Sequence, residues 1–252
     1  MRYSSPLYTT RRHNVLKNKK KSTFLSWFWV VLIIIILGLL IGFSNLNAQS
    51  LLIGFLISLY RISVAYIISI LIAIIVALII TANKVLENLF LPILDVLQSF
   101  PSFALFPVLV IALRNSPELV IISVLVISMV WPILFSIIGG VKNRREDKEE
   151  AATIFGAVGW KRLVYFTIPE LLPSIVTGSI VGWGEGWEFI IGAELLIKTN
   201  IGIGYYLGFL GENHENLSLA FGITVLLFLL FIVNKMIWLP LLEKTTIYSS
   251  DS

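Results

Sequence analysis

EEAATIFGAVGWKRLVYFTIPELLP, residues 149–173, is a polar stretch with strong helix propensity that lies between two long apolar segments. Residues 149–155 favour a helix, and Gly156 permits a turn or a close backbone approach. Residues 160–166 favour a second short helix, which we expect to end before Pro169. The stretch therefore predicts two short helices joined at a glycine, forming a compact element between the flanking apolar segments.

The chain as a whole is too apolar for a soluble domain. Hydrophobic residues make up 57% of its 252 residues and charged residues 13%, and its mean hydropathy is +0.91. Apolar runs of about 20 residues can cross a bilayer as helices, because a helix satisfies its own backbone hydrogen bonds. The runs do not alternate as barrel strands do. The sequence therefore predicts an all-α polytopic membrane protein.

The amino-acid composition also limits which metal sites and catalytic groups the chain can form. The chain has no cysteine, which excludes disulfides and thiol chemistry, and its two histidines, His13 and His214, are far apart in sequence. We therefore expect no metal site, no cofactor and no catalytic residue. Residues 1–23 carry seven Lys and Arg residues, and we interpret them as a tail facing membrane lipid and not as a nucleic-acid-binding arm.

We expect six transmembrane helices, one from each long apolar run. The second run is about ten residues longer than a span requires, and we place its first turns at the outer interface. The third run is broken by prolines, which predicts a bent first segment followed by a span. The expected runs are residues 24–44, 51–81 with the span from about residue 62, 89–114 with the span from about residue 101, 119–139, 174–196 and 217–233.

The distribution of Lys and Arg sets the orientation of these spans. Sixteen of the nineteen fall on one side, in the tails, at Lys84 and around residues 140–173, and three fall on the other. This asymmetry predicts that both termini, residues 1–23 and 234–252, are cytoplasmic, together with the 140–173 loop. Arg61, on the minority side, is interpreted as a side chain that snorkels to the outer interface, with a structural ion pair as the alternative.

Polar groups inside the apolar runs are candidates for a solute pathway or gate. Glu185 and Glu188 fall near the expected midplane, where an unpaired carboxylate costs about 3 kcal/mol or more. Glu194 falls near the outer end and, nine residues on, points away from Glu185. Structural ion pairs or protonated acids are equally open interpretations. The broken third run adds the candidates Gln98, Ser99 and Ser102.

Three glycines of the fifth run recur every fourth residue: Gly178, Gly182 and Gly186. Such a stripe lets two helices approach closely. Either a partner helix of the same chain or a second copy of the chain could pack on it.

Beyond these patterns, the quoted stretch resembles the EAA loop of ABC-transporter permeases. The family pattern is Glu-Ala-Ala, three residues, Gly, nine residues and Ile-x-Leu-Pro, and it occurs between the fourth and fifth spans. Phe166 and Ile168 replace the Ile and Leu of that pattern. The segments LPILDVLQSFPSFALFPVLV, VWPILFSIIGGV and GWEFIIGAELL also resemble permeases of the nitrate/sulfonate/taurine/bicarbonate group. The positions in register with the loop pattern are Glu150, Ala151, Ala152, Gly156 and Pro169.

The resemblance implies a type I ABC importer permease in the plasma membrane of a prokaryote, moving a small solute, such as an anion, by alternating access. It implies as partners ABC ATPase subunits that contact the loop, a second permease copy and an extracellular or periplasmic solute-binding protein. The chain has no G-x-x-x-x-G-K-[ST] run, so we expect no ATPase activity of its own. GIGYYLG, residues 202–208, has the wrong spacing for a dinucleotide loop. A stand-alone ion-coupled transporter or channel is the alternative.

Overall fold

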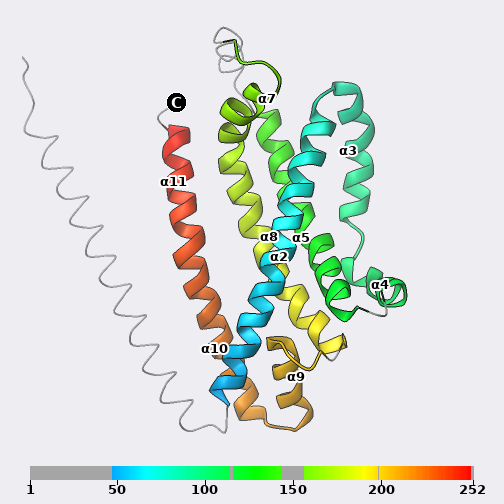
Figure 1. The fold of residues 1–252 in the computed structure, drawn as a ribbon, viewed down its shortest axis with the longest axis vertical. Helices are drawn as coiled ribbons and strands as arrows, with labels where there is room; N and C mark the ends of the chain where they lie inside the picture. Colours follow the sequence, from blue (N-terminus) through cyan, green and yellow to red (C-terminus); the bar gives the residue numbers. More distant parts are fainter. Residues whose placement is uncertain (1–46, 114–115, 144–155, 198, 251–252) are drawn as a thin grey trace, which may run out of the picture.

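The computed structural model describes residues 47–113, 116–143, 156–197 and 199–250, and every regular element in these ranges is a helix. Three long helices form the centre: α2 (Ala48–Thr81), α5 (Pro117–Lys142) and α8 (Ile168–Ile197). Figure 1 shows α7 at one end of the bundle and α9 at the other, and we refer to these as the α7 end and the α9 end.

The shorter elements flank the central helices. Two of them, η2 and η3, are π-helical turns within longer helices, and α7 and α9 lie before and after α8 in the chain. Their bounds are α3 (Lys84–Gln98), the 3-10 turn η1 (Ser102–Leu105), α4 (Phe106–Ala112), α7 (Gly159–Arg162), η2 (Leu163–Thr167), α9 (Ile203–Glu212), α10 (Asn216–Val233), η3 (Asn234–Trp238) and α11 (Leu239–Ser250).

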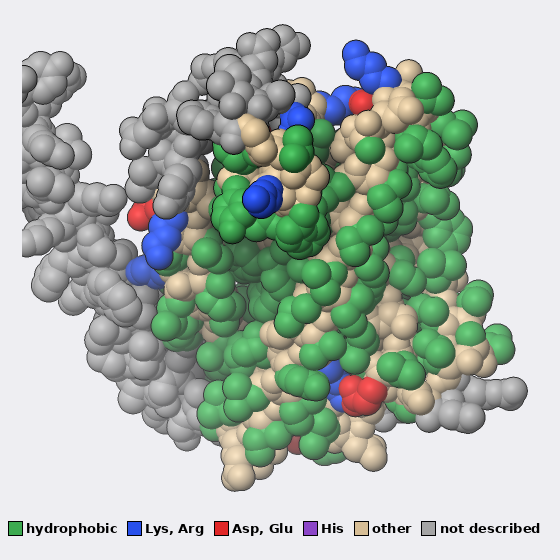
Figure 2. Space-filling view, turned by 45° about the horizontal axis from the view of Figure 1, so that its top comes forward, with side chains coloured by type: hydrophobic (Ala, Val, Ile, Leu, Met, Phe, Trp, Pro, Cys, Tyr) green, Lys and Arg blue, Asp and Glu red, His purple; other side chains and the backbone are tan. Residues whose placement is uncertain are grey.

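The core lies between α2, α5 and α8, because small residues let these helices approach closely. Buried side chains from all three helices, such as Ile62, Met129 and Ile190, are fully inaccessible to solvent. Large apolar side chains such as Leu56, Ile75 and Leu227 remain exposed on the outer surface. Figure 2 shows hydrophobic side chains over most of the visible face, as expected for a surface that contacts lipid.

Four helical stretches in the described residues are long and apolar enough to cross a membrane: 48–81, 117–142, 159–197 and 216–245. The helices 84–98 and 102–112 together form a fifth candidate, bent by 81°. The expected first span, residues 24–44, lies outside the described residues, so a count of six remains a prediction. The all-α polytopic fold is confirmed.

The third run differs from the expected bent segment followed by a span. The chain leaves α3 at Gln98 and continues as two short helices, η1 and α4, with no straight span from Pro101. Pro101 has no N–H and restricts the backbone of the residue before it, so the break falls where predicted. Pro107 lies in the first turn of α4, where a proline is tolerated.

Proline did not end the helix after the polar stretch, and this prediction was wrong. The helix that starts at Gly159 continues through η2 into α8 and reaches Ile197, passing Pro169 and Pro173. The wider π-helical turn precedes Pro169 directly. Such a turn gives the proline ring room beside the preceding carbonyls, so the helix can pass it without breaking.

Two further boundaries also moved. The segment between the expected fifth and sixth spans contains a ten-residue helix, α9, which contacts both α2 and α8. The expected sixth span does not stop at Val233, because α10 continues through η3 into α11. Trp238 of η3 is buried in edge-to-face contact with Tyr66 of α2 and Trp183 of α8, which holds this long helix against the bundle.

Candidate functional site

A buried polar cluster joins four segments near the α9 end. The Glu194 carboxylate of α8 is fully buried and accepts hydrogen bonds from the Ser58 hydroxyl at 2.7 and 2.9 Å. It also accepts from Arg61 Nη1 at 2.7 Å and from the backbone N–H of Gly204 at 2.8 Å. The Ser58 hydroxyl in turn accepts from the N–H of Ile203 at 2.9 Å. Glu194 and Ser58 thus satisfy two backbone donors at the start of α9.

Arg61 is the link between the buried and exposed parts of this cluster. Its guanidinium is almost fully buried and donates to the Ile201 carbonyl at 2.9 Å as well as to Glu194. Its Nε donates to the Glu118 carboxylate of α5 at 2.8 Å, and its Nη2 forms an ion pair with the same group. The Glu118 side chain is 58% exposed. One arginine therefore ties α2 to α5, to α8 and to the turn before α9.

Our preferred interpretation of Arg61 as a snorkelling interfacial side chain is wrong, and the alternative ion pair is confirmed. Helix α2 is continuous from Ala48, so Arg61 lies in the interior of the helix with α5 and α8 on either side. A guanidinium this buried needs paired carboxylates, since an isolated buried charge is costly. Of the other residues in this cluster, Glu194 was recognisable from the sequence, because a carboxylate in an apolar run is unusual. No pattern in the sequence had indicated Glu118 or Ser58.

Glycines allow the backbone to close around this cluster. Gly202 has φ +143°, and a Cβ there would collide with the Glu194 carboxylate. A Cβ on Gly54 of α2 would lie 2.9 Å from the Gly202 carbonyl oxygen, and one on Gly204 would lie 2.9 Å from the Ile191 Cα. The run at 202–208 thus serves tight helix packing, which explains its glycines without a nucleotide.

The described part of the polar stretch quoted first, residues 156–173, begins at the opposite, α7 end (Figure 1). Gly156 has φ +70° and Gly159 has φ +54°, conformations that favour glycine, so the expected turn is present. A Cβ at Gly156 would meet nothing within 4 Å. Glu150, Ala151 and Ala152 lie outside the described residues. Pro169 lies in the first turn of α8, inside the continuous helix.

Glu185 and Glu188 lie in the middle of α8, away from the buried cluster. Glu188 is exposed on the surface of the chain and Glu185 is half-buried. Neither has a hydrogen-bond or ion-pair partner among the described residues. Gly184, on the same side, also faces open space. Around Gly184 and Glu188 this face of α8 is therefore not covered by the described part of the chain, whereas one turn further on Phe103 packs on it. Glu194 points into the cluster, as the half-turn between it and Glu185 requires.

The remaining polar candidates lie near the break after α3. The Gln98 amide donates to the Asp95 carboxylate at 3.2 Å, and the Ser99 hydroxyl donates to the Asp95 carbonyl at 2.8 Å. Ser102 begins η1 and is half-buried. These three share no hydrogen bond with Glu185, Glu188 or Glu194, although Phe103 of η1 stacks on Phe189 of α8 with 4.4 Å between the ring centres.

The glycine stripe of α8 packs on α5 of the same chain. A Cβ on Gly178 would lie 2.8 Å from the Ile133 Cα and 2.9 Å from the Pro132 carbonyl oxygen. One on Gly182 would lie 3.0 Å from the Met129 carbonyl oxygen, and one on Gly186 would lie 3.0 Å from the Met129 Sδ. The stripe is buried in this seam, so its face is not available to a second copy.

The chain is similar to known membrane transport proteins. Residues 69–247 match the family of binding-protein-dependent transport system inner membrane components. The chain is 30% identical over 151 residues to the bicarbonate transport system permease protein CmpB of Synechococcus elongatus, and 30% identical over 153 residues to the nitrate import permease protein NrtB of Leptolyngbya laminosa. It is 27% identical over 178 residues to the taurine transport system permease protein TauC of Escherichia coli.

These matches cover 60%, 60% and 70% of this chain, and 54%, 53% and 63% of the three relatives. The chain thus spans between half and two thirds of the length of these three relatives. The multi-pass bundle of apolar helices, together with the family match, identifies a transport component of the plasma membrane. The chain belongs to the family of binding-protein-dependent transport system inner membrane components.

Proposed function

We propose that the chain is the transmembrane permease subunit of an ABC-type importer. It moves a small solute across the plasma membrane by alternating access, and separate ATPase subunits drive the cycle. The family match carries this proposal, because it extends from α2 to α11 and includes the glycine turn between α5 and α8. The relatives are named for bicarbonate, nitrate and taurine, so a small anion is the first candidate solute.

The geometry supplies a route for the coupling. The helix from Gly159 to Ile197 has 39 residues, which corresponds to roughly 58 Å at 1.5 Å per residue. It starts three residues after Gly156 and ends at the buried cluster of Glu194 and Arg61. A push from an ATPase on residues 149–156 would therefore reach α9 through one continuous helix, with η2 as the point where that helix can bend.

In this proposal Glu150, Ala151, Ala152 and Gly156 contact the ATPase, and the α7 end faces the cytoplasm. The described Lys and Arg side chains support this orientation. Lys84, Lys142, Lys161 and Arg162 lie in α3, α5 and α7 near the α7 end, where Lys142 pairs with Glu87 at 2.7 Å. The α9 end then faces an extracellular or periplasmic solute-binding protein.

The uncovered face of α8 supports a second permease copy. Glu188 cannot face hydrocarbon without a cost of about 3 kcal/mol, and no described residue covers it, which supports a wet pathway or another subunit beside it. We propose that Glu185 and Glu188 border the solute pathway between two copies. Carboxylates there would oppose an anion, which favours a gating role over direct solute contact.

The deciding experiment measures coupling at Gly156. The chain is copurified with its ATPase subunits, reconstituted in liposomes, and assayed for solute uptake per ATP hydrolysed. Replacing Gly156 by alanine strains a left-handed residue without filling a packed space, so we expect that ratio to fall while the complex still assembles. The matched control is Gly139→Ala, which also faces open space but lies in helical backbone.

A Gly156→Ala complex with the ratio of the wild type would contradict the coupling role. Glu188, which has no partner among the described residues, keeps a stand-alone ion-coupled transporter or channel as the second candidate. Solute uptake into liposomes by this chain alone, without ATP, would decide for that candidate.

A further inference from the structure

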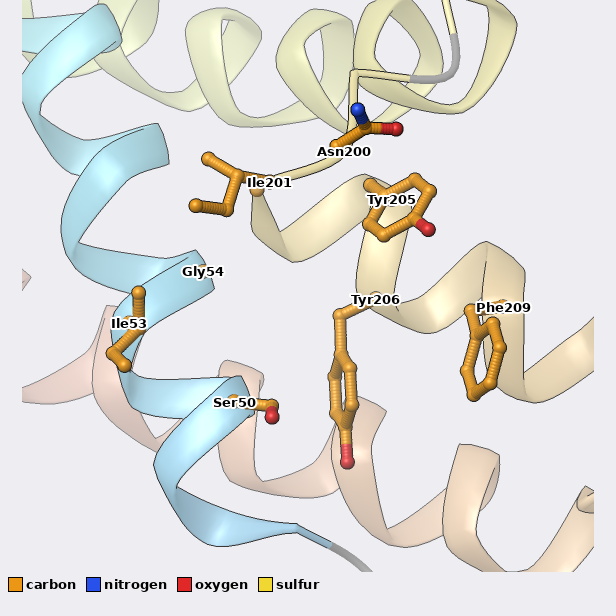
Figure 3. Close-up of a pocket in the computed structure, with 9 residues that line it drawn as sticks. Ser50, Ile53, Gly54, Asn200, Ile201, Tyr205, Tyr206 and Phe209 are labelled. Atoms are coloured by element: carbon orange, nitrogen blue, oxygen red, sulfur yellow. The ribbon is translucent and has the colours of Figure 1, made fainter.

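A pocket of about 370 Å³ lies at the α9 end, between α2, the turn at 200–202 and α9. Its size is within the usual range for small-molecule sites. Figure 3 shows the α2 side chains on one side of it and the α9 side chains on the other. The lining residues are Ser50, Ile53, Gly54, Asn200, Ile201, Gly202, Tyr205, Tyr206 and Phe209.

The lining combines aromatic surface with unused hydrogen-bonding groups. Tyr205, Tyr206 and Phe209 of α9 present three rings. The Asn200 amide, the Tyr205 hydroxyl and the Ser50 hydroxyl have no hydrogen-bond partner among the described residues. None of the nine lining residues carries a charge. The pocket can therefore stack and hydrogen-bond a ligand, but it offers no counter-ion.

The buried cluster holds the walls of this pocket in place. Arg61 donates to the Ile201 carbonyl, and Gly202 rests against Gly54 and the Glu194 carboxylate. On the far side, the Tyr206 hydroxyl accepts from the N–H of Asn47 at 3.0 Å, which ties α9 to the start of α2. A pocket with fixed walls loses little conformational freedom when a ligand binds.

We propose that this pocket is a binding site for an uncharged small molecule that carries a planar ring and a hydrogen-bonding group. The three rings favour a planar partner, and the three unused polar groups favour one with a donor or acceptor. A lipid acyl chain would leave those polar groups unpaired, and an ionised solute would lose hydration without gaining a counter-ion. The site stands independently of the proposed transport function, because it is defined by binding alone.

Nicotinamide is a suitable probe, because it is planar, uncharged and carries an amide. Its binding to the full chain in phosphatidylcholine nanodiscs is measured by saturation-transfer NMR, with about millimolar affinity expected for so small a ligand. Phe209→Ala should weaken binding about three- to tenfold, and Tyr205→Phe about threefold. The control is Phe231→Ala, because Phe231 is 49% exposed and Phe209 47%, but Phe231 lies on α10 away from the pocket.

Two related compounds test the chemistry of the ligand. Nicotinate, the ionised analogue, and cyclohexanecarboxamide, which has no planar ring, should each bind at least about threefold more weakly than nicotinamide. Equal nicotinamide signals from the Phe209→Ala and Phe231→Ala proteins would overturn the site, and this is also the result if lipid fills the pocket. Nicotinate binding as tightly as nicotinamide would overturn the assignment to an uncharged ligand.

Discussion

The Glu194→Gln substitution tests whether the buried cluster holds α9 on the bundle. Each carboxylate oxygen of Glu194 faces a group that can only donate: Oε1 faces Arg61 Nη1, and Oε2 faces the N–H of Gly204. A glutamine must turn its NH₂ towards one of these donors, so no orientation satisfies both. The loss of one hydrogen bond costs about 1–3 kcal/mol. Arg61 also loses its fully buried counter-ion, which brings the expected cost to about 3–5 kcal/mol.

Glu118→Gln is the matched control, because Glu118 pairs with the same arginine but its side chain is 58% exposed. Water compensates a lost exposed partner, so we expect a cost of only about 0–1 kcal/mol. The assay is the free energy of unfolding of the full chain in mixed detergent and SDS micelles. Similar costs for the two variants, or a cost below about 1 kcal/mol for Glu194→Gln, would refute the assignment of Glu194 as the buried partner.

A double-mutant cycle separates the interaction between Arg61 and Glu194 from the other effects of each substitution on stability. Arg61→Met alone leaves the Glu194 carboxylate buried without its counter-ion, and Glu194→Met alone leaves the guanidinium with only the exposed Glu118 carboxylate as its counter-ion. The double variant removes both charges, so it should be less destabilised than the sum of the single variants by at least about 2 kcal/mol. Additive costs would show that the two groups do not depend on each other.

Three other outcomes are expected. Gly202→Ala should destabilise the chain by about 1–3 kcal/mol in the same unfolding assay, because Gly202 has a positive φ and contacts Glu194. The control is Gly184→Ala, which faces open space and should lie within about 0.5 kcal/mol of the wild type. Gly178→Ala should destabilise by about 1–3 kcal/mol, since its Cβ would press on the α5 backbone; an unchanged unfolding midpoint would contradict the close α5–α8 seam. Glu188→Gln should reduce solute uptake by the reconstituted complex without changing its subunit composition, and wild-type uptake would remove Glu188 from the pathway.

Local patterns predicted much of the architecture. Apolar runs gave the helical membrane fold, and the prolines placed the break near residue 100, because a missing N–H and a fixed φ act through the chain itself. The same rules wrongly predicted that a helix would end before Pro169. The helix instead continues past this proline, with the π-helical turn η2 just before it. Whether such a π-helical turn forms depends on the packing of the helix that continues from it, which the local sequence does not show.

The cluster around Arg61 shows where sequence reasoning reached its limit. The midplane and outer glutamates were recognisable, since carboxylates in apolar runs are rare and costly. The sequence did not show which of these glutamates would be paired. Glu194 pairs with Arg61, 133 positions away, whereas Glu188 has no partner among the described residues. Pairing over such distances depends on which helices become neighbours.

The sequence by itself determined that this is a helical membrane protein, which end of it carries the excess of basic residues, and where a glycine turn interrupts the polar stretch. These properties follow from hydropathy, charge and backbone chemistry within single segments. Only the tertiary structure decided that this turn leads into one helix running to the α9 end, that Arg61 is buried there, and that the glycine stripe faces α5. Those features arise from the packing of helices that are remote in sequence, and a packed interior satisfies a charge only when its partner is brought alongside.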